Sequence, residues 1–440
     1  MKATKAICAM ACIAVLFAAT GVFAQSNPLF IQFSPGNTMG ALYKPDSGPA
    51  PHVGIIEMHR TANFLHEMAC TELSKRGFMV LCMNSRFVNN EAQVMWENIA
   101  LDVKAGVNYL RDVQHMDKVL MIGFSGGGPT VTYYEAVAEN GPSYCRGANK
   151  LVQCTDAVAG LPRLDGIILR DGHPGNPVNK LREMNPATSN LAEVVNENAT
   201  AKIDPSLDPF NPDNGFNPNG DSHYSDDFKK RYFKAQSDKL NELIDIAVKK
   251  RDAIAAGKYR YPDDDEFIFP RGNDARLAEL DMSVDCCTTR PERVIHNDGS
   301  IATEVYHSVR MPIPKSAETN ARFSSTTFLT INSFLSANAI RSKTAYDVDW
   351  CSSNNSSPCA LPHISVPLLV MAMGAHYFIR DGEINYDLAA SKYKEFIIVA
   401  GATHGGTPCN DCPGGPYTNS IKNMFDYMAK WINTRWPANY

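Results

Sequence analysis

Short apolar runs and helical repeats alternate along two parts of the chain. Apolar runs predict buried strands at residues 53–58, 78–83, 119–122, 166–169, 368–373 and 396–399. Apolar residues at helical spacing predict helices at residues 64–75, about 94–113, about 127–139 and 419–431. This alternation predicts an α/β fold with a mostly parallel central sheet and helices on both faces.

The stretch from Pro174 to Pro362 interrupts the alternation. It is rich in Pro, Asn, Asp and Gly, and its one convincing helical pattern lies at about residues 225–254. We therefore expect a large cap inserted at residues 174–360. The core would then be discontinuous, formed by residues 25–173 and 361–440.

The first 24 residues have the pattern of a secretion signal. Lys2 and Lys5 precede a short apolar run, and small residues up to Ala24 offer a cleavage site. The run is too short for a comfortable transmembrane helix. We expect a mature chain that starts near Gln25, has no membrane span and is periplasmic or secreted.

Charge and cysteine content agree with export. The formal net charge is −5 and becomes more negative without the two leader lysines, so no nucleic-acid partner is expected. Cys70 and Cys82 lie in apolar stretches and are expected to be buried thiols. Three close cysteine pairs in loop-like sequence predict disulfides in an oxidising compartment; they are Cys145 with Cys154, Cys351 with Cys359, and Cys409 with Cys412.

A candidate nucleophile follows the third predicted strand. Residues 123–127 read Gly-Phe-Ser-Gly-Gly, a G-x-S-x-G pattern between a strand and a helix. Small neighbours allow a tight turn that lifts the Ser125 hydroxyl above the sheet edge. The same turn would place the Gly126 amide where it can bind a developing oxyanion.

A candidate base and several candidate acids follow later in the chain. His404 lies just after the last predicted strand, and an imidazole there can take the serine proton. The acid that orients it is expected in the loop after residues 368–373, where Glu383 ranks first and Asp381 second. Asp171, directly after the strand at residues 166–169, is a third candidate.

The strand, elbow, insertion and terminal histidine together resemble the α/β-hydrolase superfamily over a little more than half of the chain. The resemblance implies a second oxyanion donor in the loop after residues 53–58. The superfamily often has His-Gly in this loop, whereas this chain has His59-Arg60, so the donor amide is expected at Arg60 or Thr61. His59 and Phe124 are candidate contacts of the substrate.

The site residues predict a serine hydrolase that acts on a small molecule, with carboxylic esters as the first choice. Amides or activated C–C bonds such as β-diketones are the alternative with the same triad, and a non-catalytic binding protein is the alternative of another class. No cofactor is expected. No metal is expected either, because the acidic loop at residues 204–221 has the pattern of turns and Cys409-x-x-Cys412 lacks a second ligand pair. Oligomeric state is not predicted.

Overall fold

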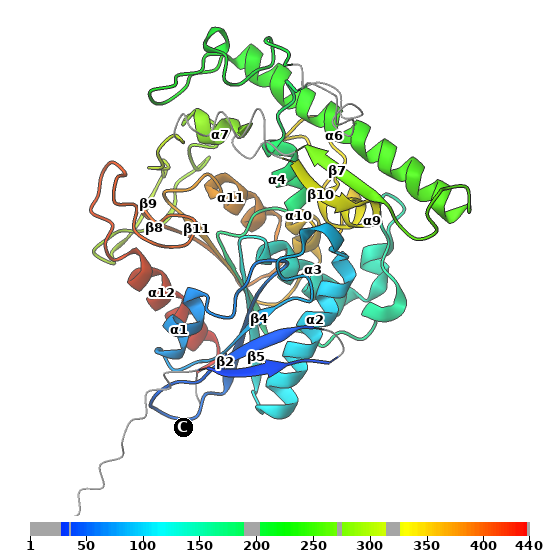
Figure 1. Cartoon of the computed structure of the whole chain (residues 1–440). Helices are drawn as coiled ribbons and strands as arrows, with labels where there is room; N and C mark the ends of the chain where they lie inside the picture. The colour runs from blue at the N-terminus through cyan, green and yellow to red at the C-terminus, as the bar shows by residue number, and fades with distance from the viewer. Residues whose placement is uncertain (1–27, 35–36, 189–202, 271–274, 314–325, 438–440) are drawn as a thin grey trace, which may run out of the picture.

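A computed structural model describes residues 28–34, 37–188, 203–270, 275–313 and 326–437 (Figure 1). The predicted secretion signal lies outside these residues. None of the described helices is both long and apolar enough to cross a membrane.

A 10-stranded sheet forms the centre of the molecule. In spatial order its strands are β1 (Leu29–Gln32), β2 (Met39–Tyr43), β4 (Met79–Asn84), β3 (Val53–His59), β5 (Lys118–Phe124), β6 (Gly166–Arg170), β11 (Leu368–Met373), β12 (Lys394–Val399), β8 (Glu292–Ile295) and β9 (Ile301–Glu304). The neighbours from β4 through β8 pair in parallel, whereas β1, β2 and β9 pair antiparallel at the two edges. The predicted α/β class with a mostly parallel sheet is therefore confirmed.

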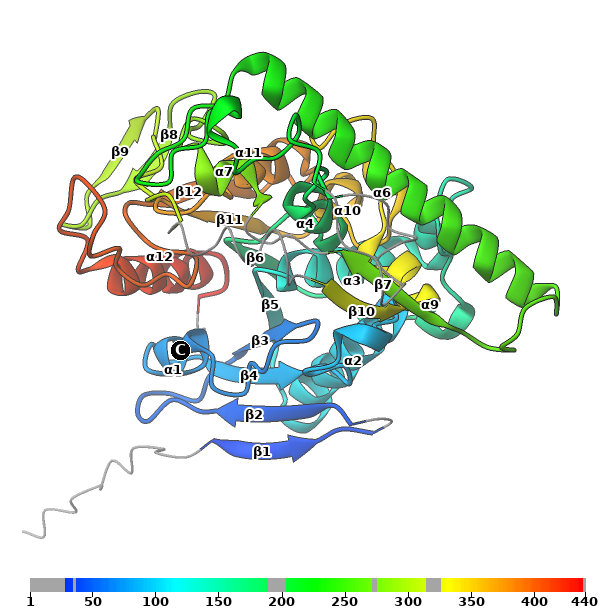
Figure 2. The same ribbon diagram turned by 45° about the horizontal axis from the view of Figure 1, so that its top comes forward.

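Helices cover both faces of this sheet (Figure 2). One face packs against α1 (Met68–Ser74) and α12 (Ser420–Arg435). The other face packs against α2 (Trp96–Asn108), α3 (Gly127–Asn140), α10 (Ser357–Ala360) and α11 (Ile379–Leu388).

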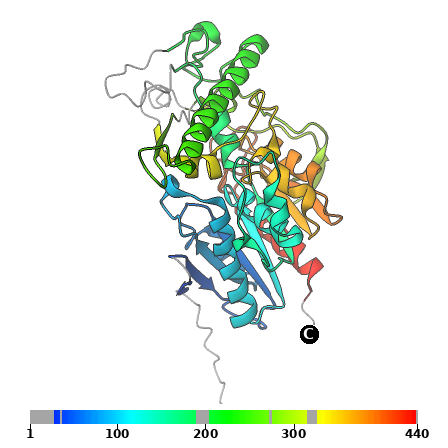
Figure 3. The same ribbon diagram turned by 90° about the vertical axis from the view of Figure 1, so that its right-hand side faces the viewer.

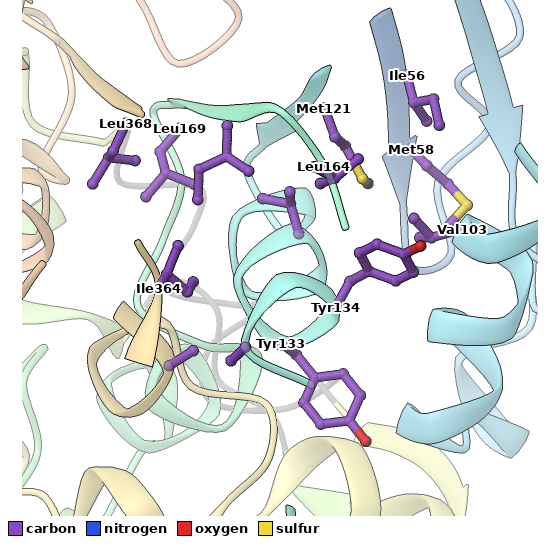
Figure 4. Packing of buried hydrophobic residues seen from close by; sticks show 14 of the residues in the cluster. Ile56, Met58, Val103, Met121, Tyr133, Tyr134, Leu164, Leu169, Ile364 and Leu368 are labelled. Carbon is purple, nitrogen blue, oxygen red and sulfur yellow. The ribbon is translucent and has the colours of Figure 1, made fainter. Parts of the chain in front are cut away.

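Apolar side chains of α2 and α3 meet those of the sheet in the larger core cluster. Figure 4 shows Val103 of α2 and Tyr134 of α3 near Met58 and Met121 of the strands. These four side chains are completely buried. Burial of a side chain of this size stabilises the fold by about 1.5–3 kcal/mol relative to exposure, which explains why the apolar pattern predicts these elements well.

The segment between β6 and β11 builds an apolar cluster separate from the two that cover the sheet. It contains α4 (Asn176–Glu183), α6 (Asp226–Ala255), β7 (Glu266–Pro270), α7 (Leu277–Leu280), β10 (Thr326–Thr330) and α9 (Ile331–Ser333). Apolar residues of α4, α6 and the antiparallel β7–β10 pair pack together away from the sheet cores. Figure 3 shows α6, in green, at the opposite end of the molecule from the blue N-terminal strands.

Part of the expected cap belongs to the central sheet instead. Strands β8 and β9 lie within residues 174–360, yet Val294 and Ile295 of β8 pair in parallel with Ile398 and Val399 of β12. This pairing joins segments that are far apart in the sequence, so no local pattern marks β8 as a strand of the sheet.

Five disulfides link the described cysteines. The three predicted pairs are confirmed, and the adjacent Cys286 and Cys287 form a further one. The prediction that Cys70 and Cys82 are free thiols is wrong. Helix α1, which carries Cys70, packs against β4, which carries Cys82. The Cα atoms of the two cysteines are 6.1 Å apart, a distance that a disulfide spans.

Candidate active site

The carboxyl ends of five neighbouring parallel strands meet at one edge of the sheet. His59 is the last residue of β3, and the other four residues follow their strands: Ser125 after β5, Asp171 after β6, His376 after β11 and His404 after β12. Ligands of open α/β sheets bind outside these strand ends. The topology therefore gathers the chemically active side chains in one place.

Ser125 lies at a strained turn from strand to helix. Its φ is +53°, a value that few residues other than glycine adopt. A Cβ on Gly123 would lie 2.6 Å from the carbonyl oxygen of Gly127, and a Cβ on Gly127 would lie 2.7 Å from that of Met58. The turn thus requires glycine at both positions, as the G-x-S-x-G pattern indicates.

His404 connects Ser125 to a buried carboxylate. Its Nε2 lies 2.9 Å from Ser125 Oγ, and its Nδ1 lies 2.6 Å from Asp171 Oδ2. Asp171 is only 2% exposed, and its Oδ1 accepts a hydrogen bond of 3.1 Å from the Met373 amide. Burial alone would raise the pKa of Asp171, but the facing imidazoles of His376 and His404 lower it to about 2.

A second imidazole lies against this line of hydrogen bonds. The His376 ring stacks on the His404 ring with centroids 4.4 Å apart. Its Nδ1 is 2.8 Å from Asp171 Oδ2, but the alignment does not make a hydrogen bond. Burial lowers the pKa of His376 to about 4, so this ring is neutral near pH 7.

The two carboxylates ranked first from the sequence lie elsewhere. Residues 374–383 are not a simple loop, because α11 begins at Ile379 and carries both side chains away from His404. Glu383 accepts hydrogen bonds from the Thr289 amide and hydroxyl and pairs with Arg380.

Asp381 forms a buried ion pair with the Arg182 guanidinium, at 2.8 and 3.0 Å. The geometry therefore corrects our ranking, since the third candidate, Asp171, is the carboxylate beside His404. The signal for it was its place directly after a strand, which Ser125 shares.

The Gly126 amide and the side-chain nitrogens of His59 and Arg60 lie near one another at the residue after Ser125. Gly126 is the N-cap residue of α3, His59 is the last residue of β3, and Arg60 follows it. The Thr61 amide, a predicted oxyanion donor, instead donates to His59 Nδ1 at 3.1 Å. The Arg60 guanidinium is paired with Glu91 through Nε and Nη2.

Phe124 lies under the histidine. Its ring centroid is 4.9 Å from that of His404, and the guanidinium of Arg170 covers its other face at 3.9 Å. Arg170 is fully buried and pairs with Glu57 at 3.0 Å and with Glu67 at 2.5 Å. This buried ion cluster supports the floor of the site from within the sheet.

The acidic and imidazole groups also meet the distance requirements of a metal site. Asp171, His376 and His404 offer three ligand atoms within 4.8 Å of one another. Both ring nitrogens of His404 are already hydrogen-bonded, one to Asp171 and one to Ser125. A metal bound there would have to displace the Asp171–His404 hydrogen bond.

Comparisons with known proteins give matches only among solved structures. No protein-family model matches the chain, and a search of curated proteins finds no significant match. Est1E from Butyrivibrio proteoclasticus is 9% identical over 93% of this chain and 99% of its own, with a TM-score of 0.40. A proline iminopeptidase from Mycobacterium smegmatis is 11% identical over 93% and 98%, with a TM-score of 0.41.

A thermostable carboxyl esterase from Bacillus coagulans is 12% identical over 93% of this chain and 98% of its own, with a TM-score of 0.39. At this level of identity and overlap, the three likenesses fix neither the reaction nor the substrate. The strand–turn–helix around Ser125 and the chain order of serine, acid and histidine are the features of an α/β-hydrolase site. The chain thus resembles the α/β-hydrolase superfamily.

Proposed function

We propose that this protein is a serine hydrolase that cleaves carboxylic esters of small molecules through an acyl-enzyme. One observation carries the proposal, namely the continuous hydrogen-bond line from Ser125 Oγ through His404 to Asp171, with lengths of 2.9 and 2.6 Å. The strained φ of Ser125 supports it, because such strain persists where function requires it.

Each member of the line has a defined task. Asp171 accepts a hydrogen bond from Nδ1–H of His404, which leaves the Nε2 lone pair facing Ser125. Ser125 Oγ attacks the carbonyl carbon while His404 Nε2 takes its proton, and the Gly126 amide stabilises the oxygen that becomes negative. His404 then gives the proton to the leaving alcohol, and a water molecule repeats the sequence to release the acid.

Export is part of the same proposal. The predicted signal and the disulfides favour an oxidising compartment outside the cytoplasm. The mature enzyme would meet its ester in the periplasm or outside the cell.

The test uses a fluorophosphonate probe and a panel of chromogenic esters with graded acyl length. We expect covalent labelling of the Ser125 peptide, turnover of at least one ester, and loss of both in the Ser125→Ala variant. The thermal transition of that variant should match the parent, because the hydroxyl contributes little packing. A folded parent that is neither labelled nor active on any ester would refute the proposal, as would a Ser125→Ala variant within about tenfold of the parent rate.

A further inference from the structure

The loop after β3 fixes the proton position on the His59 ring. His59 Nδ1 accepts hydrogen bonds from the Thr61 amide at 3.1 Å and from the Ala62 amide at 2.8 Å. A ring nitrogen that accepts hydrogen bonds carries no proton, so the single proton of the neutral ring is on Nε2. Burial, reinforced by the Arg60 charge, lowers the pKa of His59 to about 3. Nε2–H is therefore a constant hydrogen-bond donor at any pH at which His404 could act as a base.

This donor lies beside the backbone of the nucleophile turn. A Cβ on Gly126 would lie 2.5 Å from His59 Nε2 and 2.4 Å from Arg60 Nη1. Only a residue without a side chain leaves both nitrogens in place, which explains the glycine at position 126. Within the described part of the chain, no hydrogen bond engages His59 Nε2.

Thr61 and part of the Arg60 guanidinium are used to hold the loop. The Thr61 amide donates to His59, and the Thr61 hydroxyl donates to Glu91 at 3.0 Å. Arg60 uses Nε and Nη2 for Glu91, so its remaining nitrogen, Nη1, faces Gly126. The loop therefore presents two side-chain nitrogens to the nucleophile turn, while a predicted amide donor is engaged.

We propose that the second oxyanion donor of this hydrolase is the His59 side chain, through Nε2–H, with the Arg60 guanidinium beside it. The inference rests on the proposed function. When Ser125 Oγ bonds to the carbonyl carbon, the C=O π electrons move to the oxygen, and that oxygen accepts hydrogen bonds from the Gly126 amide and His59 Nε2–H. Both donors keep their protons, so the step is balanced by the proton transfer to His404 alone.

Two substitutions separate the two ends of the His59 ring. In His59→Asn, Oδ1 lies as many bonds from Cα as Nδ1 does in histidine, so it can accept from the loop amides while the Nε2 donor is lost. In His59→Gln, the side-chain nitrogen matches the histidine Nε2 position and can donate, while the acceptor for the loop is lost.

We expect His59→Asn to lower kcat by about 10²–10³-fold, the usual effect of losing one oxyanion donor, with KM within about threefold of the parent. His59→Gln should regain at least about tenfold over His59→Asn despite a lower thermal transition, because it restores a donor. A His59→Asn variant within about threefold of the parent kcat would overturn the inference. Equal loss in both variants would also overturn it, because the ring would then serve the loop alone.

The fluorophosphonate probe separates this inference from the proposed function. Its adduct places a phosphoryl oxygen at the oxyanion position, so the labelling rate of His59→Asn should fall in parallel with kcat. If the parent is labelled at Ser125 and His59→Asn is labelled equally fast, only the His59 assignment fails. If the parent is not labelled at all, the proposed function fails as well.

Discussion

Replacing Asp171 by asparagine should remove activity and leave the fold intact. The carboxylate accepts a hydrogen bond from Nδ1–H of His404, with 2.6 Å between nitrogen and oxygen, which directs the Nε2 lone pair toward Ser125. An asparagine amide can donate to Nδ1, which would move the ring proton to Nε2 and block proton transfer from the serine. We expect kcat to fall about 10⁴-fold, the loss measured when a triad carboxylate becomes its amide.

The two carboxylates of α11 should show the opposite behaviour. Asp381 and Arg182 are 3% and 4% exposed, so Asp381→Asn leaves a buried guanidinium without its counter-charge. Breaking a buried ion pair in this way costs about 3–5 kcal/mol of stability. Glu383→Gln weakens the hydrogen bonds to Thr289 and the pairing with Arg380, at about 1.5–3 kcal/mol. Neither change touches the line from Ser125 to Asp171.

The assay measures kcat on a chromogenic ester and the free energy of unfolding in urea for the same three variants. Activity is expressed per folded molecule, so that loss of stability is not mistaken for loss of chemistry. Asp171→Asn should stay folded with a loss of about 1.5–3 kcal/mol, because its buried carboxylate also accepts hydrogen bonds. Asp381→Asn and Glu383→Gln should keep kcat within about threefold. An Asp171→Asn variant with more than a tenth of the parent kcat would refute the assignment. A folded Glu383→Gln variant that lost activity about 10³-fold would return the acid to α11.

Three further outcomes follow from buried groups. Burial lowers the pKa of His59 to about 3 and of His376 to about 4, whereas both bind protons in the unfolded chain below about pH 6.5. The free energy of unfolding should therefore be greatest above that pH. Between pH 6 and 4.5 each of the two rings should lower it by about 1.4 kcal/mol for every pH unit, and an unchanged urea midpoint would contradict this. Arg170→Met should cost about 3–5 kcal/mol in urea unfolding, because the buried Glu57 and the partly buried Glu67 lose the guanidinium that they share, and a loss below 1 kcal/mol would contradict it. Replacing Cys70 and Cys82 by alanine should cost about 3 kcal/mol, the entropy of a 12-residue loop, and unchanged thermal unfolding would count against it.

Local patterns account for the part of the fold that sequence reasoning predicts. The strand at residues 368–373 coincides with β11, and the helix predicted at about residues 225–254 differs from α6 by one residue at each end. Each has an apolar repeat complete within its own segment. The nucleophile turn was predictable for the same reason, since the motif, the strand before it and the helix after it are contiguous around Ser125.

Features that depend on distant segments were not predictable in this way. Strand β8 is four residues long and only half of it is buried, so its sequence resembles a loop until β12 lies beside it. The acid was expected in the segment that follows β11, with Glu383 ranked above Asp381. Helix α11 turns Asp381 and Glu383 toward Arg182 and Thr289, and that orientation depends on the packing of the segment between β6 and β11.

The order of strands explains why the proposed acid, Asp171, follows β6 in this molecule. Strand β6 lies between β5 and β11, so the residue after it lies beside both Ser125 and the end of β11. The Met373 amide of β11 donates to Asp171, and His376 from the same strand end stacks on His404. The segment after β11, where we first expected the acid, thus begins with a neutral imidazole that lies 2.8 Å from the Asp171 carboxylate. A second carboxylate there would be a like charge at contact distance, and one of the two acids would then take up a proton and no longer stabilise the His404 imidazolium.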